Sequence, residues 1–216
     1  KRYHYDLLEK TYYEYMNLGI NDLEAIEKLK RELENKTILL LAPGKSAIEE
    51  IKKIEKFIKD NDAIVISVNF VHDKIKSDYL YMSNVKRYSE YDEKQEKYLV
   101  KKIFTSNVKN NSNNTNEIVI SFCRLLKCGW EYMDNSSILL LRLLNMLDVK
   151  KIGIAGLDGY EYGIKENYVN KDMDIYIPHG SAFVINKEIF EMLKDFYSEK
   201  KCSVEFVTSS RFEGAF

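Results

Sequence analysis

The stretch 37–46 constrains the fold of this 216-residue chain more than any other. Ile38 to Leu41 form an unbroken apolar run, which is typical of a strand buried on both faces of a parallel sheet. The run leads through Pro43-Gly44-Lys45-Ser46 into isoleucines at three- and four-residue spacing from Ile48 to Ile58, the pattern of an amphipathic helix. The segment is therefore predicted to be a strand, a tight turn and a helix.

The turn at 43–46 is the first candidate binding element. Backbone N–H groups at the start of a helix lack partners within the helix and suit an anion such as phosphate. Ser46 is expected to cap the helix, and Glu49 completes a capping-box pattern. Gly-Lys-Ser also occurs in P-loops, but Leu39 stands where that motif needs its first glycine, so a P-loop is excluded. An ordinary turn that binds nothing remains the alternative.

Further apolar runs extend the predicted sheet. Strands are expected at 63–68, 78–82, 101–105, 152–156 and 203–207, and helices at 138–147 and 186–198. The segments 118–126 and 130–133 are ambiguous between strand and helix. This alternation predicts an α/β, Rossmann-like doubly wound fold with a mainly parallel sheet, in which a ligand binds at the carboxyl ends of the strands.

Two segments lie outside this pattern. Residues 1–35 are predicted to be a helical connector, with Asp22 as the N-cap of its second helix, and residues 36–216 to be the Rossmann-like domain. The connector is expected to join an upstream domain or to mediate dimerisation, and the opening Lys1 suggests a fragment of a longer protein. The asparagine-rich stretch 107–116 is predicted to be a mobile loop, either a lid over a site or a plain surface loop.

Composition excludes several classes of partner. The chain has 33 basic and 34 acidic residues, so no overall field favours nucleic acid. There is no signal peptide and no apolar run long enough to span a membrane, and the three cysteines are expected to be reduced and buried, which together indicate a cytoplasmic protein. The histidines His4, His72 and His179 share no ligand spacing, so neither a metal nor another cofactor is expected.

Polar residues follow several of the predicted strands. They are the turn 43–46, Asn69, Ser83-Asn84 and Asp158-Gly159-Tyr160. Carboxyl ends of parallel strands meet at one edge of a sheet, so these residues are expected to lie close together, joined by the helix cap Ser136-Ser137 and by His179.

On these residues the chain resembles the bacterial sialyltransferases and the sialyltransferase-like modules of flagellin glycosyltransferases. The shared order is a strand, a G-x-S turn, a helix, a strand ending in Asn69, a serine-capped apolar helix, the run KKIGIAGLDGY, and His179 before a last helix and strand. The resemblance covers roughly residues 36–211. It implies a CMP-sugar as donor substrate, a glycan acceptor and no separate cofactor.

The resemblance also implies a role for each matching residue. Donor contacts are expected from Gly44, Lys45, Ser46, Asn69, Ser136, Ser137, Tyr160 and Tyr168. His179 matches the proposed general base on the acceptor hydroxyl, and its unperturbed pKa of ~6.5 suits that task. The alternatives are a local loop histidine for His179, a turn residue for Asn69 and helix capping for the two serines. The chain departs from the family at Pro43, where the family has asparagine, and at Lys45, where proline is usual.

A second resemblance concerns context. The segments ILLLAPGKS, VISVNF, SNVKRY and VEFVTSSRFE are similar to the domain that follows an HMG-CoA-lyase-like, 4-hydroxy-2-oxovalerate aldolase barrel in bacterial surface-polysaccharide proteins. Two functions therefore stay open. The first is a metal-independent glycosyltransferase of surface glycan biosynthesis, and the second is a non-catalytic domain that binds a nucleotide or sugar, or assembles with the aldolase. A structural homo-oligomerisation domain is a third hypothesis.

Overall fold

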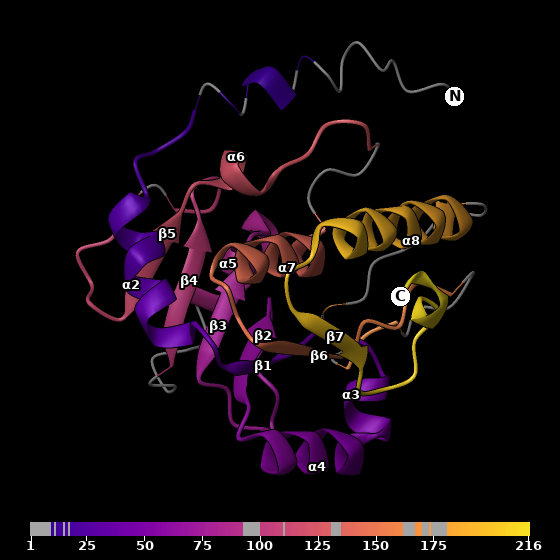
Figure 1. Cartoon of the computed structure of the whole chain (residues 1–216). Coiled ribbons are helices and arrows are strands. Elements are labelled where there is room, and N and C mark those ends of the chain that lie inside the picture. Colours follow the sequence, from indigo (N-terminus) through magenta and orange to yellow (C-terminus); the bar gives the residue numbers. More distant parts are fainter. Residues whose placement is uncertain are drawn as a thin grey trace.

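The computed structural model describes residues 10, 12–14, 16, 18–92, 100–109, 111–130, 135–161, 167–169, 173 and 181–216. In these residues, seven parallel strands form one sheet in the order β5-β4-β3-β2-β1-β6-β7 (Figure 1). The strands are β1 (Thr37–Leu41), β2 (Ile64–Val68), β3 (Tyr79–Met82), β4 (Lys101–Thr105), β5 (Glu117–Ile120), β6 (Lys151–Ala155) and β7 (Ser203–Phe206).

Helices cover both faces of the sheet, which confirms the predicted α/β, Rossmann-like doubly wound fold. They are α2 (Leu23–Leu33), α3 (Ser46–Glu49), α4 (Ile51–Asn61), α5 (Val85–Asp92), α6 (Phe122–Leu125), α7 (Ser136–Met146) and α8 (Ser181–Glu199), with a 3-10 turn η2 (Glu213–Ala215) near the end. Figure 1 shows α4 on one side of the sheet and α7 and α8 on the other.

The unbroken apolar runs have a simple cause. Side chains alternate between the two faces of a strand, and both faces of β1 are buried. Ile38 and Leu40 belong to the core beneath α2, α7 and α8, whereas Leu39 and Leu41 belong to the core beneath α4. All four are fully buried, so a polar residue is tolerated at none of them without a hydrogen-bonding partner.

The strand order reverses direction between β1 and β6. From β1 the chain adds β2, β3, β4 and β5 on one side, and then crosses to place β6 on the other side of β1. In open α/β sheets the crevice at such a switch point is where ligands bind. The polar residues that follow β1, β2, β3 and β6 are thereby gathered at one edge, as the sequence predicted.

Several helix boundaries differ from those expected. The helix after β1 is broken at Glu50, whose carboxylate accepts the Ser209 N–H at 2.9 Å. The helix α8 begins five residues earlier than predicted, and the ambiguous segment 118–126 contains both the end of β5 and α6. Asn135 caps α7, because its side-chain oxygen accepts the Ile138 N–H at 3.2 Å, whereas Ser136 and Ser137, the expected caps, are the first two residues of the helix.

Asp22 precedes α2 but does not cap it with its side chain. Its buried carboxylate accepts the Ser121 N–H at 2.8 Å and pairs with the Arg124 guanidinium of α6. Burial opposes the charge, yet the Arg124 and Ser121 hydrogen bonds prevail and lower the pKa of Asp22. This pair ties α2 to the sheet, and Leu29 and Leu33 of α2 lie fully buried in the main core.

Two further expectations are partly corrected. Cys123 and Cys202 are buried, but Cys128 is exposed. In the asparagine-rich loop, Asn107 donates to the Ser83 carbonyl at 3.0 Å, and none of the described loop residues lines the pocket that is described below. None of the described helices has the length and apolar character needed to cross a lipid bilayer.

His72, on the connection from β2 to β3, ties that connection to α3. Its Nδ1 accepts the N–H groups of Lys74 and Ile75, both at 3.0 Å, and its Nε2 donates to the Ala47 carbonyl at 3.2 Å. Nδ1 accepts hydrogen bonds only in the neutral ring. Burial lowers the pKa of His72 and therefore favours that neutral form.

This arrangement predicts a loss of stability in acid. Because the folded-state pKa lies below the unfolded value, the contribution of His72 is present above ~6.5 and is lost as pH falls through the folded pKa. In His72→Asn the side-chain oxygen accepts the same N–H groups without titrating. Urea unfolding of both proteins between about pH 7.5 and 4.5 should show a smaller decline for the variant. Parallel curves would contradict the assignment.

Candidate functional site

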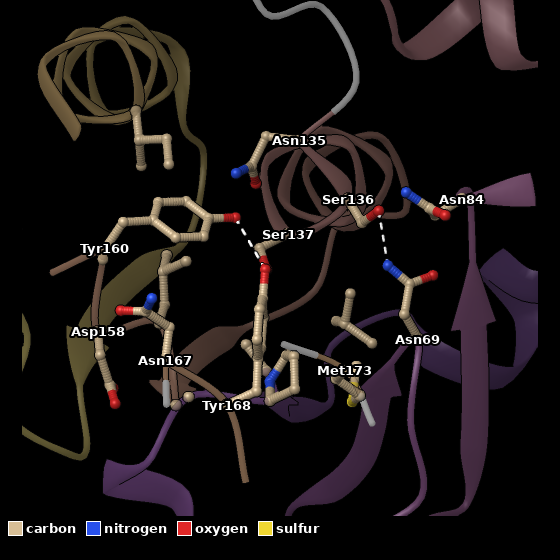
Figure 2. Close-up of a pocket in the computed structure, with 18 of the residues that line it drawn as sticks. Asn69, Asn84, Asn135, Ser136, Ser137, Asp158, Tyr160, Asn167, Tyr168 and Met173 are labelled. Atoms are coloured by element: carbon tan, nitrogen blue, oxygen red, sulfur yellow. Dashed lines mark hydrogen bonds between the residues drawn. The ribbon is translucent and has the colours of Figure 1, made fainter. Parts of the chain in front are cut away.

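A pocket of about 330 Å³ lies at the switch point, at the carboxyl ends of β1, β2, β3 and β6. This volume is at the lower end of the range for small-molecule sites. Figure 2 shows Asn69, Asn84 and Ser136 on one side and Tyr160, Asp158 and Asn167 on the other. The rest of the lining comes from α5, α7, α8 and the described part of the segment between β6 and α8.

One wall is a hydrogen-bonded group at the ends of β2 and β3. Asn69 adopts a left-handed backbone with φ of 60°, which asparagine tolerates better than most residues. Its side-chain amide donates to Ser136 Oγ at 2.8 Å (Figure 2), and the Ser83 hydroxyl donates to the same oxygen at 2.7 Å. Ser136 Oγ thus accepts two hydrogen bonds, and its own proton is left to point elsewhere.

The N-terminus of α7 forms part of this wall. Asn135, Ser136 and Ser137 all line the pocket, and Asn135 already satisfies the N–H of Ile138. No described residue accepts a hydrogen bond from the N–H of Ser136 or Ser137. An 11-residue helix carries a partial positive charge at this end, so the wall favours a negatively charged group.

Two tyrosines form the opposite wall. The hydroxyls of Tyr160 and Tyr168 lie 3.1 Å apart, with the rings edge to face (Figure 2). Asn186 of α8 fixes the Tyr160 backbone with two hydrogen bonds of 2.8 Å. The Tyr160 N–H donates to the Asn186 side-chain oxygen, and the Asn186 amide donates to the Tyr160 carbonyl. Tyr168 pairs with Gly44 in an isolated antiparallel bridge. The sequence named both tyrosines, and the structure brings them together.

The turn 43–46 differs from the expectation of unpaired N–H groups. The Gly44 N–H donates to the Gly156 carbonyl at 2.8 Å, and the Ser46 N–H donates to an Asp158 carboxylate oxygen at 2.8 Å. Ser46 is buried, its hydroxyl contacts Asp158 and Thr208, and it forms no capping box. Gly44 lines the pocket, whereas Lys45 and Ser46 do not.

Asp158 takes the place at this turn that an external anion was expected to occupy. Its carboxylate is largely withdrawn from water, and this burial raises its pKa, although the Ser46 hydrogen bonds act in the opposite direction. The carboxylates of Glu49 and Glu50 raise it further. The sequence indicates only that Asp158 follows a predicted strand, because its contact with Ser46 spans 112 positions of the chain.

Two parts of the pocket have no clear signal in the sequence. Arg87 of α5 is buried, lies 5.8 Å from the centre of the Tyr168 ring, and pairs with Glu90 at 3.0 Å. The apolar wall of α8 consists of Ile185, Ile189 and Met192. The four-residue spacing from Ile185 to Ile189 is visible in the sequence, but it predicts only a buried helix face.

His179 lies outside the described residues, so its expected role stays a prediction. Among the described residues, no three histidine, cysteine, aspartate or glutamate side chains gather as a metal site requires. The titratable groups that line the described pocket are Lys86, Arg87, Asp158, Tyr160 and Tyr168.

Comparison with known proteins adds a structural likeness. No family model and no curated protein matches the chain. Among solved structures, it is similar to a mammalian sialyltransferase crystallised with Gal-beta-1-3GalNAc-ortho-nitrophenol. The match covers 92% of this chain and 85% of that one, with 11% sequence identity and a TM-score of 0.48. The fold assignment above rests on the strand order and on the helices of both faces.

The contact between the two turns gives a direct prediction. A Cβ on Gly44 would lie 2.4 Å from the Gly156 carbonyl oxygen and 2.6 Å from Asp158 Cγ. Gly44→Ala must therefore push the turns apart, and we expect it to lower the free energy of unfolding by about 2–4 kcal/mol in urea denaturation.

Gly214→Ala is the matched control for that substitution. The nearest atom to a Cβ at Gly214 is 4.0 Å away, so the free energy of unfolding should change by less than about 0.5 kcal/mol. Equal effects of the two substitutions would show that the turns do not constrain each other.

Proposed function

We propose that this chain is a metal-independent glycosyltransferase whose donor is a nucleotide sugar with a single phosphate, of the CMP-sugar class. The observation that carries the proposal is one pocket in which the N-terminus of α7 faces two tyrosine hydroxyls. Both walls offer hydrogen-bond donors to an anion without a metal ion. The setting in bacterial surface glycan biosynthesis is a prediction from the sequence resemblance.

The phosphate is proposed to bind at the start of α7. The N–H groups of Ser136 and Ser137 and the positive end of the helix dipole favour a negative charge there. The hydroxyls of Tyr160 and Tyr168, on the opposite wall, would donate to the same group as the sugar departs. These donors are fixed by Asn135 and Asn186 before any ligand arrives, which lowers the cost of organising them around the leaving phosphate.

The remaining walls suit a nucleoside. Ile185, Ile189 and Met192 of α8 offer an apolar surface for a base or a sugar ring. Asn69 and Asn84 supply amide groups at the other side of the pocket. The Asn69 side chain already donates to Ser136 and accepts the Ser83 N–H, and the Asn84 side chain already accepts the Arg87 N–H. Asn69 is thereby proposed as a donor-contacting residue, alongside its structural role at the end of β2.

The proposed reaction is a single displacement. The acceptor hydroxyl oxygen forms a bond to the anomeric carbon, the bond from that carbon to the phosphate oxygen breaks, and the nucleotide leaves with the electron pair. The acceptor proton passes to a base, for which the sequence predicts His179. The N-terminus of α7 and the hydroxyls of Tyr160 and Tyr168 stabilise the departing phosphate.

A second candidate is a binding domain without catalysis. Asp158 is the one carboxylate among the described pocket residues, and both of its oxygens accept hydrogen bonds from Ser46. It is poorly placed to take an acceptor proton, so the proposed base remains His179, which the sequence predicts. Without that base, the same pocket would serve a domain that binds a nucleotide or assembles with an aldolase-like partner.

Binding is tested by thermal unfolding with CMP, UDP, CDP and CMP-sugars. At 100 times its dissociation constant, a ligand adds ~2.7 kcal/mol to the stability of the protein, or roughly 5–10 °C for a chain of this size. Tyr168→Phe should weaken CMP binding by about tenfold, because a hydrogen bond to a charged phosphate is lost. Tyr197→Phe, an exposed position on α8 stacked on Phe216, is the matched control and should leave CMP binding unchanged.

No shift with any of these nucleotides would refute the proposed donor site. If CMP binds, hydrolysis of a CMP-sugar by the wild type and by His179→Ala separates the two candidates. Loss of hydrolysis with retained CMP binding supports the transferase, and equal rates in the two proteins remove His179 from the mechanism.

A further inference from the structure

Asp158 places a carboxylate at the edge of the proposed nucleotide pocket. Its two carboxylate oxygens accept the Ser46 N–H at 2.8 Å and the Ser46 hydroxyl at 2.5 Å. Ser46 Oγ also lies 2.8 Å from Thr208 Oγ1, and Thr208 Oγ1 accepts the Gly156 N–H at 3.0 Å. The carboxylate is therefore held in place by the turns that follow β1 and β6.

No cation of the described residues pairs with this carboxylate. The basic residues that line the pocket, Lys86 and Arg87, both belong to α5 and both pair with Glu90, at 3.7 and 3.0 Å. Among the described residues, the charged groups that act on Asp158 are Glu49 and Glu50, which carry the same sign. An anion placed beside the turn after β1 would thus meet a carboxylate that no described cation neutralises.

The position of Asp158 beside the turn after β1 is significant because this turn binds phosphate groups in many proteins of similar topology. In doubly wound proteins that bind dinucleotides, the pyrophosphate lies at the turn after the first strand. Here that turn has no donor to offer from Gly44 or Ser46, since both N–H groups are bonded to Gly156 and Asp158. If one phosphate of a nucleotide lies at the start of α7, a second phosphate at the turn after β1 would lie against the Asp158 carboxylate.

We propose that Asp158 is a specificity-determining residue that excludes ligands with a second phosphate, so that the pocket accepts nucleoside monophosphates and rejects nucleoside diphosphates. The proposal rests on the proposed function, because it needs a nucleotide in this pocket. Discrimination of this kind comes from a repulsive element directed at the wrong ligand rather than from a better contact with the right one.

The test compares CMP and CDP by isothermal titration calorimetry in the wild type, Asp158→Asn and Glu49→Gln, at one pH and salt concentration. In Asp158→Asn the Oδ1 atom still accepts the Ser46 N–H, and the amide donates to Ser46 Oγ, so the turn is retained. Removing the charge should raise CDP affinity relative to CMP affinity on the order of tenfold. Glu49→Gln removes an exposed carboxylate that acts on Asp158 but does not line the pocket, and should change the ratio less than about twofold.

The outcomes separate the two proposals. A wild type that prefers CMP, with a preference that falls in Asp158→Asn but not in Glu49→Gln, supports the role of Asp158. An unchanged ratio of the two affinities in Asp158→Asn overturns that role and leaves the nucleotide site intact. Absence of CMP and CDP binding in every protein overturns both. If Asp158→Asn does not fold by circular dichroism, Asp158→Ser serves as the second neutral variant with the same expected change.

Discussion

The close approach of two turns, one after β1 and one after β6, is the contact on which the site depends. Ala42 and Gly44 donate their N–H groups to the carbonyls of Ala155 and Gly156, both at 2.8 Å, so the parallel pairing continues past the strands. Gly156 has φ of 72°, and a Cβ there would lie 2.0 Å from the Ala42 carbonyl oxygen. Only glycine permits this approach, and the pocket opens beside it.

The same contact decides where an anion can bind. It places Asp158 beside Ser46, so that the carboxylate accepts the Ser46 N–H and hydroxyl hydrogen bonds. In P-loop and dinucleotide-binding proteins, the donors of the corresponding turn bind phosphate. The N-terminus of α7, on the other wall, has N–H groups that no described residue accepts. Charge is therefore arranged across the pocket, with a carboxylate at one edge and the positive end of a helix dipole at the other.

The sequence is sufficient for much of the fold because local patterns determine it. Runs such as Ile38–Leu41 are buried on both faces and identify strands directly, and Asn135 identifies the start of α7. The gathering of Asn69, Ser136 and Tyr160 at one edge follows from parallel topology alone. The partner of Ser46 could not be predicted, because Asp158 reaches it through the register of β1 with β6 rather than through any local spacing.

A crystal structure of the protein with bound CMP tests the central claim most directly. The account predicts phosphate density within hydrogen-bonding distance of the Ser136 and Ser137 N–H groups, close to the hydroxyls of Tyr160 and Tyr168, with Asp158 still bonded to Ser46. Phosphate density at the turn 43–46, with the Asp158 carboxylate displaced from Ser46, would contradict it.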